Sequence, residues 1–438
     1  MSIKRIISFI LTAMLLWSIA FPALALVKSQ NPLIDPQTVA YVETKDELLN
    51  VLLLGIEKGF GEYHQSNWEK KPTLRECHTD VVMMLVINKT QKRIDLLSIP
   101  RDTLVYVPGV YGIYKVNAAF NLADTDEAGF EKVKETVSWL LGGVKIDAYC
   151  AVDMLGLVTL TDAMGGVDFY VDMTYTGSSE TRYYPGTQHL NGMGVMDYVR
   201  ARTNATVDND DLGRNRRGRA MITTFIQRLR DDLDTVKALW DITQTNKDIT
   251  FLTDLTLNDV LTIWNAIQTY DSKIGSYGLT GYYGDGGLDW YFNFTDQAAR
   301  QSTLKTVYGI DAEPLPYVSR KYTLWMQNNG GFKTSHNLRV TQRVLSFAQT
   351  YENPTEAMKE NLSRLEAAYN ATVEAFDRAA DTLEENDRLR MMNIRTEMET
   401  LTELVAKQFH YPDAVNWVRA QEWDKDPLIN DYYELNWR

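Results

Sequence analysis

The chain has 438 residues, of which 45% are hydrophobic and 24% are charged. This length and balance indicate a folded protein with room for more than one domain, and they exclude a disordered chain. A formal net charge of -13 gives a surface that repels phosphate backbones, so we expect no nucleic-acid partner.

The N-terminus has the pattern of an export segment. Lys4 and Arg5 precede a long run without charged residues, and the run ends near an Ala-Leu-Ala pattern at 23–25 that is typical of a signal-peptidase site. The run is also long enough to span a bilayer, which takes roughly 20 residues. Residues 1–27 are therefore predicted to be a cleaved signal peptide or a single transmembrane anchor. In either alternative the rest of the chain is exported, and it begins with a linker over 28–45.

Glycine divides the exported part of the chain. The first glycine is Gly55 and the last is Gly331. Because glycine is the usual residue of tight turns, we expect a turn-rich domain over 46–310 and a helical extension over 320–438.

Apolar runs and amphipathic segments alternate within residues 46–310. Strands are predicted over residues 48–56, 80–88, 93–99, 147–153 and 167–171. Helices are predicted over residues 130–141 and 154–164, and each is followed directly by a pair of glycines that ends it. This alternation predicts an α/β fold with three α/β/α layers around a mixed, partly parallel sheet.

The C-terminal extension has its own start signal. Asn353 is predicted to cap a helix, with Pro354 at its first position and Glu356 as the acid of a capping box. Apolar residues then recur at helical spacing on both sides of the polar stretch EENDR, which predicts an antiparallel helical hairpin. The apolar stripe either packs against the rest of the protein or binds a partner.

Two cysteines leave two alternatives. Cys77 and Cys150 are far apart in the sequence, so they either form one disulfide in the exported protein or remain two buried thiols. No cysteine and histidine cluster has the spacing of a structural zinc site.

Polar residues stand at the ends of two predicted strands. Asp80 precedes the second buried run, while Arg101 and Asp102 directly follow the third. Ligands gather at strand ends in open α/β sheets, although any one of these residues can also be a solvated loop charge. Lys115 and Asn117 stand just before another helix-like start.

The stretch YVRARTNATVDNDDLGRNRRGRA holds six arginines and no lysine. Arg200 and Arg202 are predicted to lie on one face of an extended segment that follows a helix. Asp211 is predicted to cap the next helix, on which Arg214 and Arg217 share a face. Two arginines from each segment can then grip one phosphate group at a helix N-terminus, and the alternative is a surface salt-bridge network.

The carboxylates and the arginines together favour phosphoryl transfer. Asp80 and Asp102 offer hard oxygen ligands suited to Mg²⁺, which binds through one or two carboxylates together with substrate phosphates. Phosphoryl transfer depends mainly on positioning and charge neutralisation, which a metal and an arginine cluster supply.

Seven segments, in order, resemble the LytR-CpsA-Psr family. They are NVLLLGI, HTDVVMMLVIN, LLSIPRDTLVYVPG, YKVNAAF, DAYCAVDMLGLVTLTDAMGGVDFYV, YYPGTQHLNGMGVMDYVRAR and DDLGRNRRGRA. The resemblance covers residues 48 to about 230 and implies an α/β/α core on the extracytoplasmic side of the bacterial cell envelope, membrane-anchored or secreted. It implies transfer of a glycopolymer, of teichoic acid or capsular polysaccharide type, from an undecaprenyl-pyrophosphate carrier to peptidoglycan.

The resemblance also implies roles for single residues. Asp80 and Asp102 would bind Mg²⁺, with Mn²⁺ as a possible substitute. The residues implied to hold the pyrophosphate are Arg101, Lys115, Arg200, Arg202, Arg214 and Arg217. The residues implied to be catalytic are Asp102, Arg101, Arg200 and Arg202, with Asp102 as the candidate that activates the acceptor hydroxyl. Asp211 and Asn117 would support this site.

Two positions depart from the family pattern. Gly218 follows Arg217 where the family commonly has glutamine, and Thr79-Asp80-Val81 stands where it has Ser-Asp-Thr.

Two other functions are open at this point. One is hydrolysis of polyprenyl pyrophosphate by water, and the other is non-catalytic binding of prenyl phosphates in the envelope.

Overall fold

A computed structural model describes most of the chain. The described residues are 26–36, 38–56, 73–74, 77–177, 180–201, 211–270, 273–285, 291–315 and 317–412. They form two compact units, one of residues 36–323 and one of residues 26–35 together with 324–412. The predicted signal peptide or anchor lies outside the described residues up to position 25. Among the helices that are described, none combines the length and the apolar character needed to cross a bilayer.

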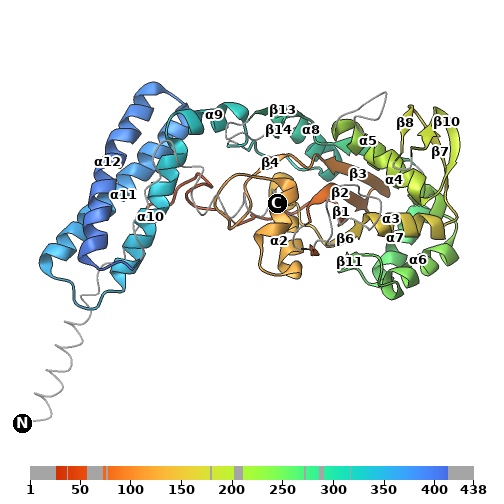
Figure 1. The fold of residues 1–438 in the computed structure, drawn as a ribbon, viewed down its shortest axis with the longest axis horizontal. Coiled ribbons are helices and arrows are strands. Elements are labelled where there is room, and N and C mark those ends of the chain that lie inside the picture. The colour runs from red at the N-terminus through yellow and green to blue at the C-terminus, as the bar shows by residue number, and fades with distance from the viewer. Residues whose placement is uncertain are drawn as a thin grey trace, which may run out of the picture. The chain divides into compact units, whose positions relative to one another are not determined.

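A mixed sheet of six strands lies at the centre of the α/β unit, with the strand order β11-β6-β1-β2-β3-β12 (Figure 1). The strands are β1 (Leu48–Ile56), β2 (Thr79–Asn88), β3 (Arg93–Ile99), β6 (Ala148–Asp153), β11 (Phe251–Thr253) and β12 (Ile274–Gly278). β1 runs antiparallel to β2 and parallel to β6, and β3 runs antiparallel to β2 and parallel to β12. The long apolar runs of β1, β2 and β3 fit their central places, because such strands are covered on both faces.

Helices cover both faces of this sheet. On one face, Ile222 of α5 (Asp211–Leu229) and Ala266 of α7 (Leu257–Thr269) pack with Met83 of the sheet. On the other face, Phe130 of α2 (Asp126–Leu140) stacks on Tyr149 of β6, with 4.2 Å between ring centroids and 12° between planes. The predicted three-layer α/β/α fold is therefore confirmed.

Shorter elements complete the α/β unit. They are β4 (Leu104–Val105), β5 (Tyr114–Lys115), the 3-10 helix η3 (Val116–Leu122), α3 (Met154–Ala163), β7 (Val167–Val171), β8 (Tyr175–Thr176), β9 (Arg182–Tyr183), β10 (Gly186–Leu190), α4 (Gly192–Arg200), α6 (Leu233–Thr245), β13 (Gly281–Asp285), β14 (Tyr291–Thr295) and α8 (Gln297–Tyr308). The strand predicted over 167–171 forms as β7, but it pairs with β10 in a separate two-stranded sheet. Its inward side chains, Phe169 among them, pack with Tyr198 of α4 and Met221 of α5.

Neither cysteine forms a disulfide. Cys77 is buried, while Cys150 on β6 is partly buried. The alternative of a disulfide between them is therefore not realised in the structure.

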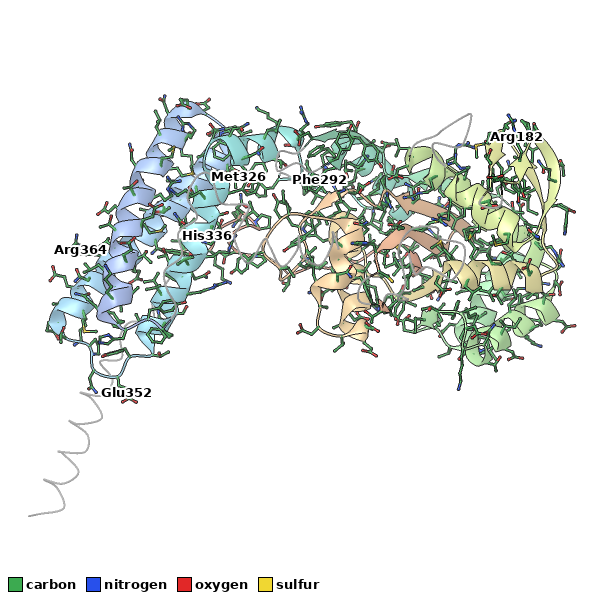
Figure 2. All side chains as sticks on the ribbon, viewed as in Figure 1. Arg182, Phe292, Met326, His336, Glu352 and Arg364 are labelled. Carbon is green, nitrogen blue, oxygen red and sulfur yellow. The ribbon has the colours of Figure 1, made fainter. Side chains whose placement is uncertain are left out.

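The second unit is helical. Its helices are α10 (Gly331–Gln349), α11 (Glu356–Thr382) and α12 (Glu385–Gln408), and α9 (Arg320–Asn328) leads into it. The antiparallel hairpin predicted from the sequence is formed by α11 and α12. The predicted cap is wrong by two residues, because the Thr355 hydroxyl, and not Asn353, accepts the Met358 amide at 3.3 Å. His336 of α10 points into the unit and Arg364 of α11 points to solvent (Figure 2).

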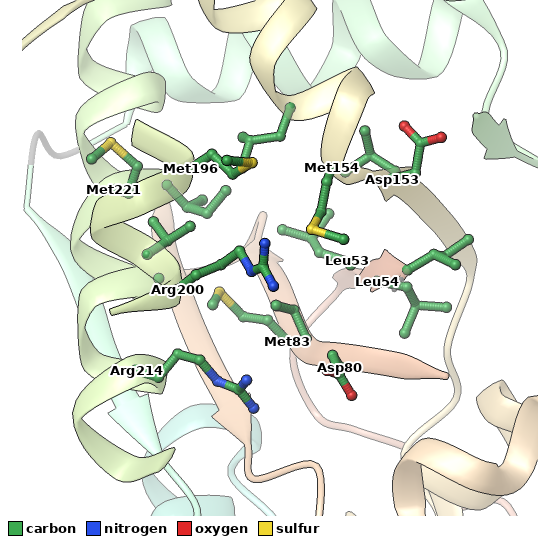
Figure 3. A pocket seen from close by; sticks show the side chains of 18 of the residues that line it. Leu53, Leu54, Asp80, Met83, Asp153, Met154, Met196, Arg200, Arg214 and Met221 are labelled. Carbon is green, nitrogen blue, oxygen red and sulfur yellow. The ribbon is translucent and has the colours of Figure 1, made fainter. Parts of the chain in front are cut away.

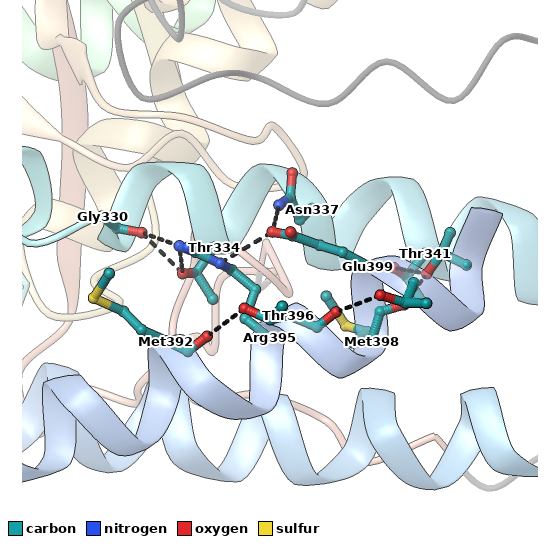
Figure 4. Close-up of polar contacts among 11 residues, drawn as sticks. Gly330, Thr334, Asn337, Thr341, Met392, Arg395, Thr396, Met398 and Glu399 are labelled. Atoms are coloured by element: carbon teal, nitrogen blue, oxygen red, sulfur yellow. Dashed lines mark hydrogen bonds and ion pairs between the residues drawn. The ribbon is translucent and has the colours of Figure 1, made fainter.

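A buried polar seam joins α10 to α12 (Figure 4). Arg395 donates to the Thr334 hydroxyl at 3.1 Å and pairs with Glu399 at 3.0 Å. Further along, the hydroxyls of Thr341 and Thr402 lie 2.9 Å apart. Polar partners at fixed positions in an apolar bundle match only in one register, so this seam sets how the two helices align.

The segment that follows the predicted export signal belongs to the helical unit. The Ser29 hydroxyl donates to Asp377 of α11 at 2.6 Å, and the Gln30 amide donates to the same carboxylate at 3.2 Å. Leu33 and Ile34 are buried, and Arg339 of α10 donates to the Leu33 carbonyl at 2.9 Å. The first part of the predicted linker over 28–45 is therefore held by the C-terminal helices.

We expect Asp377→Ala to loosen this segment. The change removes the acceptor of Ser29 and Gln30, and each lost hydrogen bond of this kind is worth about 1–3 kcal/mol. Hydrogen exchange at the amides of residues 29–31 should accelerate accordingly. Glu374→Ala, at an exposed position on the same helix, is the control and should leave this exchange unchanged. Equal exchange in both variants would contradict the assigned contact.

Candidate functional site

Arg101 is the centre of a charged cluster at the strand ends. It lies just after β3, and its Nη1 donates to Asp80 Oδ2 on β2 at 2.7 Å. Its Nε lies 3.4 Å from Asp211 Oδ2 at the start of α5 and 3.7 Å from Asp102 Oδ2. Burial alone lowers the pKa of Arg101, but Asp80, Asp211 and Asp102 outweigh burial and raise that pKa above its ordinary value. Arg101 is therefore a permanent cation.

Two further cations complete the cluster. Lys115 Nζ on β5 lies 2.9 Å from Asp102 Oδ1, and Arg214 Nη2 on α5 lies 3.1 Å from Asp211 Oδ1. The Asn117 amide donates to the Arg101 carbonyl at 3.2 Å, so η3 holds the turn that carries Arg101. Asn117 thus supports the site through its backbone.

A cavity of about 490 Å³ opens beside this cluster (Figure 3). Its charged wall includes Asp80, Arg101, Arg200 and Arg214. The rest of its wall is mainly apolar and is formed by Leu53, Leu54, Ile56, Val81, Met83, Val152, Met154, Leu157, Met196, Val199, Met221, Ile222 and Phe225. The volume lies within the range of small-molecule sites, and the wall suits a ligand with a charged head and an apolar tail.

The structure brings together two of the four arginines of the predicted anion clamp. Arg200 and Arg214 both line the cavity and reach toward Asp80 (Figure 3). Arg200 is the last residue of α4, not part of an extended segment. Arg202 lies outside the described residues.

Arg217 lies elsewhere. Its side chain is fully buried, where it donates from Nη2 to the Ala201 carbonyl and from Nη1 to Met173 Sδ at 3.9 Å. Three residues along a helix leave about 60° between Arg214 and Arg217, and this turns Arg217 toward β7 and away from the cavity. The prediction that Arg217 holds a pyrophosphate does not fit this placement. Arg217 instead fixes the end of α4, next to Arg200.

Two of the residues that depart from the pattern named in the sequence analysis line the cavity. They are Val81 on β2 and Gly218 on α5. A Cβ atom on Gly218 would have Met83 Cε as its nearest neighbour, at 3.8 Å, so the glycine leaves open space in the wall. The departures therefore change the apolar part of the cavity and leave the charged cluster intact.

One carboxylate oxygen suits a metal ion. Asp80 Oδ1 is buried and accepts no hydrogen bond from the described residues. The described part of the chain contains no group of three or more histidine, cysteine, aspartate and glutamate residues placed to hold a metal. Mg²⁺ needs only one or two carboxylates when a substrate phosphate supplies other ligands, so Asp80 and Asp102 are the residues that would hold such an ion.

The sequence patterns missed Tyr283 on β13. Burial raises the pKa of its phenol, and Asp211 and Asp102 raise that pKa further. The phenol thus lies in the field of the charged cluster. Tyr283 belongs to none of the recognised motifs, and only the long-range packing of its hairpin reveals it.

The fold and the site define a member of the LytR_cpsA_psr family, and the chain belongs to that family. The family model matches residues 23–306, which include every residue of the charged cluster and of the cavity wall described above.

Several known proteins are similar to parts of the chain. A protein of Corynebacterium glutamicum, named probable cell wall biosynthesis protein LcpB, is 37% identical over 139 residues, 32% of each chain. A protein of Oceanobacillus iheyensis, named polyisoprenyl-teichoic acid–peptidoglycan teichoic acid transferase TagU, is 26% identical over 258 residues, which are 57% of this chain and 72% of TagU. The crystal structure of Bacillus subtilis TagV has a TM-score of 0.49 at 24% identity, covering 62% of this chain and all of that one. The chain thus spans only part of the length of LcpB and of TagU.

Arg217 and a neighbouring arginine should differ in their effect on stability. Arg217→Met leaves the buried Ala201 carbonyl without its donor, so the free energy of unfolding should fall by roughly 1–3 kcal/mol. Arg216→Met removes a partly exposed pair with Asp172 and should cost at most about 1 kcal/mol. Urea unfolding followed by tryptophan fluorescence measures both. Equal stabilities would show that Arg217 has no structural role.

Proposed function

We propose that the protein is a phosphotransferase that moves a glycopolymer from an undecaprenyl-pyrophosphate carrier to a hydroxyl of peptidoglycan. One observation carries this proposal: a cluster of guanidinium and carboxylate groups stands at the charged wall of an apolar cavity. A prenyl pyrophosphate has the matching halves, a multiply charged head and a hydrocarbon tail. The name of the relative TagU, a teichoic acid transferase, supports the same class of reaction.

The donor would bind by its two halves. Its prenyl chain would lie along the apolar wall, where each buried methylene contributes about 0.8 kcal/mol. Its pyrophosphate would meet Arg101, Arg200 and Arg214, whose planar forks hold phosphate oxygens at two points. The four methionines of the wall, Met83, Met154, Met196 and Met221, are flexible enough to adapt to a branched chain.

The transfer would proceed by displacement at phosphorus. The acceptor hydroxyl oxygen attacks the phosphorus atom that carries the glycopolymer, and a new P–O bond forms to peptidoglycan. The bond from this phosphorus to the bridging oxygen breaks, and undecaprenyl phosphate leaves with the electron pair. Arg101, Arg200 and Arg214 neutralise the charge on the non-bridging and leaving oxygens.

Asp102 is our candidate to accept the proton of the hydroxyl. Lys115, at 2.9 Å, fixes one of its oxygens, and Arg101 lies 3.7 Å from the other. These contacts orient the carboxylate without covering it, since its side chain keeps 16% of its surface exposed. An oriented carboxylate of this kind can take up the proton as the new bond forms.

Mg²⁺ is our proposed cofactor, with Mn²⁺ as a substitute. Asp80 and Asp102 would hold it, and when bound it would neutralise phosphate charge and help to orient the pyrophosphate. We further propose that the protein works on the extracytoplasmic side of the bacterial envelope, anchored or released through residues 1–27. Its polymer would be of teichoic acid or capsular polysaccharide type.

Arg200→Met should abolish transfer of labelled polymer from its prenyl-pyrophosphate carrier to peptidoglycan by the purified protein. We expect a loss of roughly 100-fold or more, because a charge that neutralises the transition state is removed from an exposed position where folding does not depend on it. Arg216→Met, on the far side of α5 and paired with Asp172, should keep the wild-type rate.

The products of the same assay separate the alternatives. If the polymer is released without linkage to peptidoglycan, water is the acceptor, and the protein is a pyrophosphatase instead of a transferase. Wild-type turnover in Arg200→Met would sink the assignment of the cavity as the donor site.

Removal of divalent cations by a chelator should stop transfer, and Mg²⁺ should restore it. Asp80→Asn removes the negative charge of a proposed metal ligand, so the Mg²⁺ concentration for half-maximal rate should rise by roughly 10-fold to 100-fold. Asp168→Asn, at a site that is 79% exposed and belongs to β7, is the control and should keep the wild-type requirement. Full activity in the chelator would refute the proposed cofactor.

A further inference from the structure

A β-hairpin is fastened to the segment that carries Asp102. The Asn293 amide of β14 donates to the Asp102 carbonyl at 2.9 Å, and Asn293 also forms a bridge with Thr103. Phe292, which is fully buried, anchors the same strand in the core (Figure 2). The hairpin of β13 and β14 is therefore held in place at the charged cluster by its backbone.

Tyr283 lies directly opposite Asn293 in this hairpin. Side chains of directly opposed residues stand on the same face of a two-stranded sheet, so both project from one face. Tyr283 stacks on Tyr291, with 6.1 Å between ring centroids and 10° between planes, and this fixes the direction of the phenol. The hairpin thus presents a phenol and an amide side by side.

Both side chains have buried polar atoms that lack a partner. The Tyr283 hydroxyl and both amide atoms of Asn293 are buried, and within the described residues none of them has a hydrogen-bond partner. Asn293 as a whole is only 1% exposed. Buried polar groups are nearly always hydrogen-bonded, so neighbouring groups without partners indicate a place where a ligand supplies them.

The surroundings of the phenol define the ligand's chemistry. The charged groups that act on Tyr283 are Asp211, Asp102, Arg214 and Arg101, which belong to the charged cluster. Two of them, Arg101 and Arg214, are proposed to hold the pyrophosphate. Burial and the two carboxylates raise the pKa of the phenol, so it keeps its proton at neutral pH and acts as a donor. A neutral O–H donor beside arginines suits an anionic oxygen.

We propose that the Tyr283 hydroxyl is a further substrate-positioning group, which donates a hydrogen bond to a phosphate oxygen of the donor's pyrophosphate. This inference rests on the proposed function for the identity of the donor. Asn293, as the opposite residue, offers its amide to the same group. The phenol supplies no charge, so it directs the pyrophosphate among the cations and does not add to its neutralisation.

Tyr283→Phe tests this role because it removes only the hydroxyl and keeps the stacked ring. The neighbouring variant Tyr282→Phe is the matched control, since Tyr282 is 52% exposed and its ring packs on Phe294 with 5.4 Å between centroids. We would measure the affinity of the full chain for inorganic pyrophosphate in the presence of Mg²⁺ by calorimetry, together with thermal unfolding and the transfer rate.

Tyr283→Phe should weaken pyrophosphate binding by roughly 10-fold to 100-fold, the range expected for a hydrogen bond to a charged group. The melting temperature should not fall, because the hydroxyl has no partner among the described residues to lose. Tyr282→Phe should match the wild type in affinity, transfer and melting temperature.

The outcomes separate this inference from the proposed function. If the wild type binds pyrophosphate and Tyr283→Phe binds it more weakly, but no polymer reaches peptidoglycan, the inference stands and the proposed transfer fails. Equal affinities of Tyr283→Phe and the wild type would overturn the inference, whatever the transfer rate. A wild type that does not bind pyrophosphate, or a Tyr283→Phe protein whose loss of affinity follows a lowered melting temperature, would overturn it as well.

Discussion

The site depends on the ion pairs of one guanidinium group. Arg101 contacts Asp80, Asp102 and Asp211, which belong to β2, to the turn after β3 and to α5. These elements are distant in the sequence, and a partly buried cation between them ties the strand ends to the start of the helix. Loss of one partner would leave an uncompensated charge in a place with little water, so the whole cluster is held in one arrangement. The ion pairs of Arg101 therefore also fix the position of the cavity wall, because residues of β2 and α5 line the cavity.

Helix α5, which carries Arg214, also leaves open space in the apolar wall of the cavity. Gly218 lies inside α5, where glycine costs roughly 1 kcal/mol relative to alanine, and its backbone is not in the left-handed region that favours glycine. No close neighbour requires it either, since the nearest atom to a Cβ there would be 3.8 Å away. Among the described residues, the one structural consequence of this glycine is open space in the cavity wall. The helix that carries Arg214 therefore contributes to both the charged wall and the apolar wall of the cavity.

The parts of the fold and of the site that follow local rules could be predicted from the sequence. The apolar runs of β1, β2 and β3 have the pattern of strands buried on both faces, and Arg101 with Asp102 follows directly from the end of β3. The burial of Arg217 could not be predicted. Arg214 and Arg217 are about 60° apart around α5, and this difference places one side chain at the cavity and the other in the core. The spacing of the charged residues does not say how the helix is rotated against the sheet. Tyr283 and the N-terminal segment that binds Asp377 depend on contacts between residues far apart in the chain. Periodicity carries no information about such contacts.

The charge balance of the cluster bears on how a ligand enters it. Three carboxylates, Asp80, Asp102 and Asp211, are matched by three cations, Arg101, Lys115 and Arg214, so the paired groups are neutral before a ligand binds. At the rest of the cavity wall, Arg200 adds one positive charge and Asp153 adds one negative charge. A pyrophosphate diester carries about two negative charges, so on binding it would leave this poorly solvated site with an excess of negative charge. The proposed divalent cation, arriving with the pyrophosphate, would use the open oxygen of Asp80 and would offset part of this excess without breaking the ion pairs of Arg101. The electrostatics of the described residues thus favour a donor that binds together with its metal ion over one that binds as a bare anion.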